Sequence, residues 1–143
     1  MREILFRGKR IDNGKWVYGY VLVYTNQKNP YIQLANIATP FVFESDVAFE
    51  VDPTTVGQYT GLTDKNGKKI FEGDIIKIVP DYGYSDDYSI SKVYSYNGIF
   101  CVDYHGDDFD STALGFLEDY LPDGGFEVIG NIYDNPELLE NKP

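Results

Sequence analysis

The chain has 143 residues, a size typical of one domain or of one domain with a small lobe. Hydrophobic residues make up 43% and aromatic residues 16%, which excludes a globally disordered chain and favours half-buried β-strands. The net charge of −11 argues against a general DNA-binding protein, because neutralising phosphates requires clustered Lys and Arg.

The charge is distributed unevenly along the chain. Residues 1–30 carry six basic groups against two acidic ones, whereas residues 81–123 carry ten acidic groups and only Lys92. The ordinary interpretation is a solvated charge pattern that keeps the protein soluble. An alternative is an acidic decoy that mimics the charge of DNA.

The sequence also indicates the cellular compartment of the protein. No run of eighteen apolar residues is present, and the first residues have no apolar stretch of signal-peptide length. Cys101 is the only cysteine and lies in the apolar stretch Ile99–Val102, which predicts a buried, inert thiol. We therefore expect a cytoplasmic protein that does not contact a membrane.

The N-terminal segment predicts two strands around a turn. Asn13-Gly14 is a tight-turn signal, because both residues tolerate positive φ. Trp16, Tyr18 and Tyr20 then repeat with period two, which places three aromatic side chains on one face of a strand and Val17 on the other.

The middle of the chain alternates short strands with turns. Strands are expected at 31–34, 41–43, 54–59 and 69–71, and a β-branched strand at 75–79 ends before a proline. Asp64–Gly67 and Glu72–Asp74 are predicted to be tight turns. A Gly-Asp turn before an aliphatic strand is common in small SH3-like barrels.

The last third predicts a hairpin and short helical pieces. Strands at 92–96 and 99–104 flank Asn97-Gly98, a second hairpin signal. Ser111–Leu121 is either one helix or a bent strand. Its helical stripe would comprise Thr112, Ala113, Phe116, Leu117 and Tyr120. A strand at 126–129 precedes a single helical turn at 136–140.

These elements predict a mainly β fold. Residues 1–50 would form an N-terminal strand region with a β-hairpin, and residues 51–143 an SH3-like barrel domain that ends in a short helical turn. The alternative organisation is one compact unit overall.

Three stretches together resemble a known family. They contain Asn13-Gly14-Lys15-Trp16-Val17-Tyr18-Gly19, Phe71-Glu72-Gly73-Asp74-Ile75 and Gly130-Asn131-Ile132-Tyr133-Asp134-Asn135-Pro136-Glu137, within residues 7–19, 56–75 and 128–139. This combination resembles the YopX family of bacteriophage and prophage proteins. The resemblance implies an SH3-like barrel with additional strands, a homo-oligomer, a phage origin and an intracellular location. It supplies no catalytic residue.

Turn chemistry accounts for most residues of these motifs. We expect them to occupy turns or bulges where the chain needs free φ or a local hydrogen-bond acceptor. The set is Gly57, Gly61, Asn66, Gly67, Gly73, Asp74 and Gly130. Asp74 in particular is expected to accept a backbone N–H at the Glu72-Gly73 turn.

One acidic segment could in principle bind a hard cation, because four carboxylates lie within eight residues. The weak candidate ligands are Asp103, Asp107, Asp108 and Asp110. A solvated acidic hairpin end is the favoured interpretation. His105 is the only histidine, which excludes a His-rich zinc site within one chain. No cofactor is expected.

One strand face could serve as an interaction surface. The basic residues Arg7, Lys9 and Arg10 lie beside the aromatic row Trp16, Tyr18 and Tyr20, and together they could stack nucleic-acid bases with cationic help. The favoured interpretation is that these aromatic side chains fill the core or a subunit interface, because a period-two aromatic face is typical of a half-buried strand.

The leading functional prediction is a phage-encoded, non-enzymatic, homo-oligomeric module that binds an unidentified phage or host protein, because its tyrosine-rich loops suit an interface. The alternatives are a nucleic-acid-associated accessory protein that uses the basic-aromatic face, and the acidic decoy. An enzyme ranks last. A Ser-His-Asp or Cys-His arrangement would have to use His105, and no phosphate-binding glycine loop is present.

Overall fold

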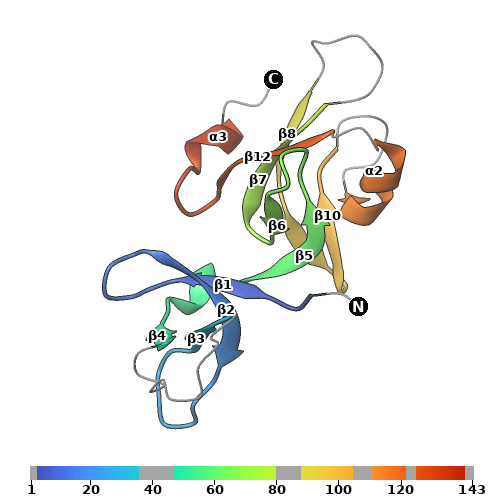
Figure 1. Ribbon diagram of the computed structural model, residues 1–143. Coiled ribbons are helices and arrows are strands. Elements are labelled where there is room, and N and C mark those ends of the chain that lie inside the picture. Colours follow the sequence, from blue (N-terminus) through green and yellow to red (C-terminus); the bar gives the residue numbers. More distant parts are fainter. Residues whose placement is uncertain (1–2, 36–46, 80–87, 105–110, 122–124, 141–143) are drawn as a thin grey trace. The chain divides into compact units, whose positions relative to one another are not determined.

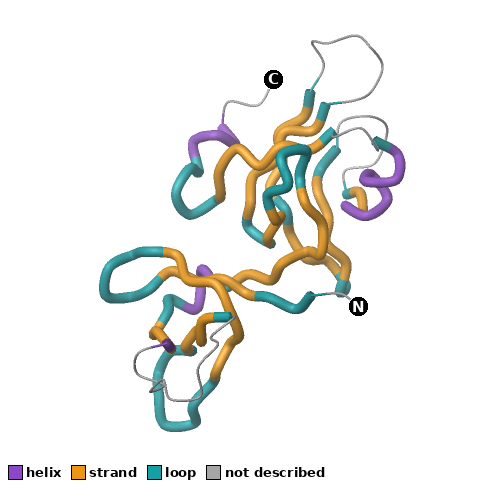
Figure 2. Tube along the Cα trace, in the orientation of Figure 1, coloured by secondary structure: helices purple, strands orange, loops and turns teal. Residues whose placement is uncertain are grey.

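The computed structural model describes residues 3–35, 47–79, 88–104, 111–121 and 125–140. The chain forms two compact units, Met1–Tyr59 (unit 1) and Thr60–Pro143 (unit 2). Strands dominate both units, so the fold is mainly β, as the sequence predicts (Figures 1 and 2).

Unit 1 is an antiparallel sheet of four strands in the order β4-β3-β2-β1. The strands are β1 (Phe6–Lys9), β2 (Trp16–Leu22), β3 (Tyr31–Leu34) and β4 (Ala48–Glu50). A 3₁₀ turn, η1 (Pro53–Thr55), follows β4, and the start of β5 (Gly57–Thr63) pairs with β1. A bridge between Arg10 and Val51 ties the segment after β1 to the segment after β4.

One face of this sheet forms the core of unit 1. Val17, Ile32 and Val51 are buried there, with Phe6 and Phe49 packed against them. The period-two alternation of the strands places these apolar residues on one side and the polar and aromatic residues of β1 and β2 on the other.

A close approach between β2 and β3 explains a glycine in the middle of β2. A Cβ atom on Gly19 would lie 1.7 Å from the carbonyl oxygen of Gln33, which no side chain can accommodate. Gly19 therefore allows the two backbones to pack together between the exposed rings of Tyr18 and Tyr20.

Unit 2 contains the end of β5 and seven further strands. They are β6 (Lys69–Phe71), β7 (Asp74–Ile78), β8 (Ser89–Lys92), β9 (Tyr94–Tyr96), β10 (Ile99–Val102), β11 (Thr112–Ala113) and β12 (Phe126–Asn131). Two short helices, α2 (Leu114–Tyr120) and α3 (Glu137–Glu140), complete it. The three-stranded sheets have the orders β12-β7-β8 and β11-β10-β9. The described strands form open sheets without a closed barrel, so the expected SH3-like barrel is not confirmed.

A hydrophobic cluster forms a core in the described part of unit 2. Its buried members come from the strands, from α2 and from residues next to them, and they are Ile70, Ile76, Ile78, Val93, Val102, Leu114, Leu117, Leu121 and Phe126. Cys101 is buried as a free thiol, as the sequence predicts. No helix within the described ranges is long and apolar enough to cross a membrane.

Two sequence predictions need correction. The helix expected over 111–121 is present but shorter, because β11 occupies Thr112–Ala113 and α2 begins only at Leu114. The predicted helical stripe is right for Leu117, which is buried together with Leu114, and wrong for Phe116, which is 62% exposed. The strand expected at 54–59 starts later, at Gly57, because Asp52 caps the 3₁₀ turn before it.

Other elements agree with the sequence more closely. The strand at 69–71 has the predicted bounds, and the C-terminal helical turn is confirmed as α3. In the turn at Asn13-Gly14, only Gly14 has a positive φ. The hairpin loop is longer than this dipeptide, because the hydrogen bond that closes it runs from the Arg10 N–H to the Lys15 carbonyl. The strand expected at 41–43 lies outside the described residues.

Candidate interaction surfaces

The first candidate surface lies on β1 and β2. The antiparallel register places Arg7 opposite Tyr18 and Lys9 opposite Trp16. Because directly opposed residues share a face of the sheet, these four side chains lie together, and Tyr20 follows on the same face. We call this set (Arg7, Lys9, Trp16, Tyr18 and Tyr20) the β1–β2 face.

The tyrosines of the β1–β2 face point to solvent. Tyr18 is 43% exposed and Tyr20 is 48% exposed. Val17, which precedes Tyr18, and Gly19, which lies between the two tyrosines, are buried. The two tyrosines therefore do not fill the core, which corrects that part of the favoured sequence interpretation. The core-filling role belongs to the opposite face of β2.

Two cations surround the indole ring on this face. The guanidinium carbon of Arg7 lies 4.6 Å from the centroid of the Trp16 ring, and Lys9 Nζ lies 5.7 Å from it. Arg7 is only 5% exposed, so the contact holds a buried positive charge against an electron-rich ring. Such cation–π contacts are stronger where water is excluded.

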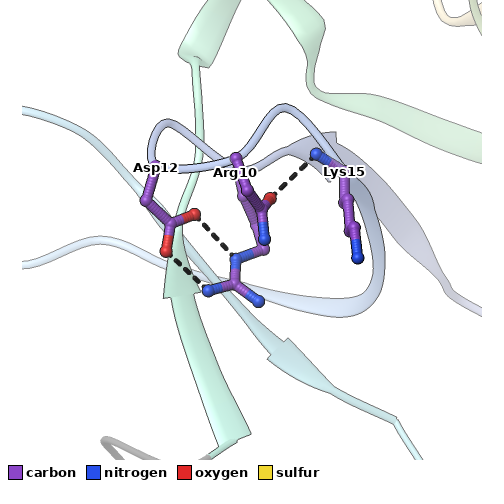
Figure 3. A network of polar contacts seen from close by, with 4 residues as sticks. Arg10, Asp12 and Lys15 are labelled. Atoms are coloured by element: carbon purple, nitrogen blue, oxygen red, sulfur yellow. Dashed lines mark hydrogen bonds and ion pairs between the residues drawn. The ribbon is translucent and has the colours of Figure 1, made fainter.

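Arg10 does not belong to the β1–β2 face. Its guanidinium carbon lies 4.1 Å from the centroid of the Phe49 ring, which packs against the core of unit 1. Figure 3 shows the same guanidinium paired through two nitrogens with Asp12, at 2.9 Å and 2.6 Å. This exposed pair lowers the Asp12 pKa, chiefly through the Arg10 side-chain hydrogen bond. The alternation of β1, which puts Arg7 and Lys9 on one side, sends Arg10 to the other.

The second candidate surface is the end of the β9–β10 hairpin in unit 2. Tyr96 and Ile99 are directly opposed in the register and are 62% and 53% exposed. The turn between them has φ of 52° at Asn97 and 80° at Gly98, the left-handed conformation that an Asn-Gly turn favours. This turn thus presents an aromatic and an aliphatic side chain side by side.

The motif residues of unit 2 mostly build turns. Gly61, Gly67 and Gly73 have positive φ. The Asp74 carboxylate accepts the Phe71 N–H at 2.7 Å and so closes the turn between β6 and β7. Gly57 lies in the β1–β5 pairing opposite Arg7.

Gly130 lies at a β-bulge. The register of β12 against β7 shifts between Val128 and Gly130, and a Cβ atom on Gly130 would lie 2.6 Å from Asn135 Oδ1. A side chain at this position would displace the Asn135 amide, whose Oδ1 accepts the Asn131 N–H at 3.3 Å, and no positive φ is involved.

Sequence reasoning missed a carboxylate that accepts three backbone N–H groups. Asp64 Oδ1 accepts the backbone N–H groups of Asn66 and Lys68, and its Oδ2 accepts that of Val128, each at 2.9 Å. The Asp-x-Asn-Gly pattern signals the first bond, because Asp binds its own backbone two residues on. The bond to Val128 bridges a separation of 64 residues and leaves no local signal.

The acidic metal candidate is only partly described. The Asp103 carboxylate accepts the Tyr94 hydroxyl at 2.7 Å, and Tyr94 also contacts Ser111 Oγ at 2.9 Å. The other candidate ligands, Asp107, Asp108 and Asp110, lie outside the described residues, as does His105. Within the described ranges, no three His, Cys, Asp or Glu side chains come together as a metal site would require.

Comparisons with known proteins match most of the chain. The model of the YopX protein family matches residues 5–140. The SPbeta prophage-derived uncharacterized protein YopX of Bacillus subtilis (strain 168) is 42% identical over 76 residues, which is 52% of this chain and 52% of that protein. The chain thus aligns with about half the length of that relative.

Two crystal structures resemble the fold over nearly the whole chain. Protein EF1440 from Enterococcus faecalis gives a TM-score of 0.59 with 26% identity, covering 97% of this chain and 99% of that one. The yopX protein from Bacillus subtilis gives a TM-score of 0.56 with 25% identity, covering 94% and 96%.

Proposed function

The chain belongs to the YopX protein family, and we propose that it acts in the cytoplasm of a phage-carrying host as a non-enzymatic module that binds another protein. The observation that supports this proposal is the exposed pair Tyr96 and Ile99 at the end of the β9–β10 hairpin. Two large exposed side chains that lie side by side are better suited to contact another protein than to remain in water.

The chemistry of the pair favours a protein surface as the ligand. Tyrosine buries a large area at a low entropic cost and retains a hydroxyl for a hydrogen bond, so it is enriched at interfaces. The adjacent aliphatic side chain of Ile99 adds area that water does not solvate well. The partner is therefore expected to offer a shallow apolar pocket with a hydrogen-bond acceptor at its edge.

The finer features follow from the motif resemblance. We propose that the chain is homo-oligomeric and that residues 51–143 are related to SH3-like barrels. Light scattering of the purified protein tests the oligomer, and a strictly monomeric mass at all concentrations would contradict it. The non-enzymatic part rests on the sequence, which offers His105 as its only imidazole.

The experiment is a tagged pull-down from a lysate of the phage-carrying host, with and without nuclease, read by mass spectrometry. The bait proteins are the wild type, a Tyr96→Ala/Ile99→Ala double variant and a Tyr18→Ala variant as matched control. The control removes a comparably exposed tyrosine from unit 1.

The proposal expects a protein that survives nuclease, is captured by the wild type and the control, and is lost with the double variant. A partner retained by all three baits would overturn the hairpin as the docking surface. A DNA-binding enzyme captured through charge alone, and released by salt, would favour the acidic-decoy alternative.

A further inference from the structure

Three Asn-Gly dipeptides occur in the chain, and each joins two neighbouring strands. They are Asn13-Gly14, Asn66-Gly67 and Asn97-Gly98, and all six residues are exposed. In this dipeptide the backbone nitrogen of glycine can attack the asparagine side chain, because glycine has no side chain that hinders the approach. Exposure does not distinguish the three sites, so their hydrogen bonds decide which of them reacts.

The turn at Asn13-Gly14 holds both reacting groups in hydrogen bonds. The Gly14 N–H donates to the Arg10 carbonyl at 2.9 Å, and Asn13 Oδ1 accepts the Lys15 N–H at 2.9 Å. The Arg10 N–H also donates to the Lys15 carbonyl at 2.8 Å and closes the same loop. The Gly14 nitrogen therefore reaches the Asn13 side chain only after both of the first two bonds break.

The turn at Asn66-Gly67 is bound to a buried residue. The Gly67 N–H donates to the Asp64 carbonyl at 3.0 Å, and the Asn66 N–H donates to Asp64 Oδ1 at 2.9 Å. Asp64 is only 7% exposed, and the Lys65 N–H joins the same turn to the Phe126 carbonyl on β12. This glycine nitrogen is likewise held away from the neighbouring side chain.

The turn at Asn97-Gly98 differs from both. Within the ranges that the structure describes, neither the Gly98 N–H nor the Asn97 side chain has a hydrogen-bond partner. The turn is flanked by the last pair of the β9–β10 ladder, Tyr96 and Ile99, which are 62% and 53% exposed. Local opening costs least where few bonds and little burial hold a segment, so this turn should open most often of the three.

We propose that Asn97 is a site of spontaneous deamidation, and that the reaction alters the exposed pair Tyr96 and Ile99. When the turn opens, the Gly98 backbone nitrogen attacks Asn97 Cγ and a C–N bond forms. The bond from Cγ to Nδ2 breaks, and the proton of the Gly98 N–H leaves with that nitrogen as ammonia. Water then opens the cyclic imide at the side-chain carbonyl, which gives aspartate, or at the backbone carbonyl, which gives isoaspartate. The reaction consumes one water and needs no oxidant or reductant.

Both products change the end of the hairpin. Each places a carboxylate between two large exposed side chains, where a partner with an apolar pocket would have to desolvate it. Isoaspartate also routes the backbone through the side chain and adds one methylene to a two-residue turn, which disturbs the pairing of Tyr96 with Ile99. The effect on partner binding rests on the proposed function of the hairpin, whereas the reaction at Asn97 does not.

The test is incubation of the full-length protein at mildly alkaline pH, followed by peptide mapping with mass spectrometry at all three dipeptides. In the folded protein Asn97 should react about tenfold faster than Asn13 and Asn66, because fewer hydrogen bonds must break first. In urea the three rates should become similar. An isoaspartyl methyltransferase, which transfers a labelled methyl group from S-adenosylmethionine, detects the isoaspartate product. The matched variant is Asn97→Gly, which suits the same turn and cannot deamidate there.

Two further measurements follow the hairpin after incubation. Backbone amides of β9 and β10 should exchange with deuterium faster in the incubated wild type than in incubated Asn97→Gly. In the pull-down, the incubated wild type should capture less partner than fresh protein, whereas Asn97→Gly should capture the same amount before and after incubation.

Several results would overturn the proposal. Equal rates at the three dipeptides of the folded protein, or a faster reaction at Asn13 or Asn66, would refute the assignment of Asn97. Unchanged exchange and unchanged capture after Asn97 has reacted would refute its effect on the pair. If fresh wild type captures no partner at all, the proposed function fails, and the rates and the exchange still decide this inference.

Discussion

Replacing Asp64 tests whether a single carboxylate joins the β5–β6 turn to β12. Asp64 is 7% exposed, and its two oxygens accept three backbone N–H groups. The Lys65 N–H donates to the Phe126 carbonyl at 3.0 Å, so the same turn is bound to β12 by a second bond. Without the carboxylate, the turn keeps the backbone hydrogen bonds that join Asp64 to Gly67 and Lys68. It loses the side-chain bonds to Asn66 and Lys68 and the side-chain bond to Val128 on β12.

The loss of stability expected for Asp64→Ala depends on the surroundings of the three backbone N–H groups that Asp64 binds. A hydrogen bond to a charged acceptor contributes about 1.5–3 kcal/mol. The N–H groups of Asn66 and Lys68 belong to an exposed turn where water can replace the carboxylate, so most of the loss comes from Val128 on β12. We expect unit 2 to lose about 2–3 kcal/mol with alanine, and about 1–2 kcal/mol with asparagine, which keeps one acceptor.

The direction in which the free energy of unfolding changes with pH follows from the pKa of Asp64. Burial alone would raise the pKa of Asp64, but the backbone N–H groups of Val128, Lys68 and Asn66, together with the Lys68 charge, lower it below the ordinary 3.8. A carboxyl whose pKa is lower in the folded state contributes stability above its unfolded pKa and loses it as the pH falls through the folded value. The difference between wild type and Asp64→Asn should therefore be full near neutral pH and shrink below about pH 4.

Urea unfolding followed by far-ultraviolet circular dichroism at several pH values measures both effects. The matched control is Glu127→Gln on β12, whose exposed ion pair with Lys65 spans 3.4 Å and should change stability by less than about 0.5 kcal/mol. A loss from Asp64→Asn no larger than that of the control, or a difference that does not depend on pH, would refute the role of Asp64 in joining the turn to β12.

Three further predictions concern packing in both units. Gly19→Ala should destabilise unit 1 by about 3 kcal/mol or more, because its Cβ would overlap the Gln33 carbonyl, and a urea midpoint close to that of the wild type would contradict the close approach. Arg10→Ala should change the midpoint little, because its pair with Asp12 is exposed, so a large shift in urea unfolding would show that the Phe49 contact dominates. Cys101 should react with a thiol reagent only after denaturant is added, and rapid labelling of the native protein would contradict its burial.

Local chemistry made several elements predictable. The period-two row of β2 identifies a strand with two faces, and Asn97-Gly98 identifies a hairpin turn. The terminal helical turn followed from Pro136 and the residues around it. In each case the deciding interaction lies within a few residues, so the sequence contains it in full.

Features that depend on distant contacts were not predictable in this way. The direction of an aromatic face is ambiguous from periodicity alone, because Val17 and Tyr18 are both suited to a core. Packing of Val17 against Ile32 and Val51 decides it. The position of Arg10 depends on its bridge to Val51, and the steric role of Gly19 depends on the β3 backbone.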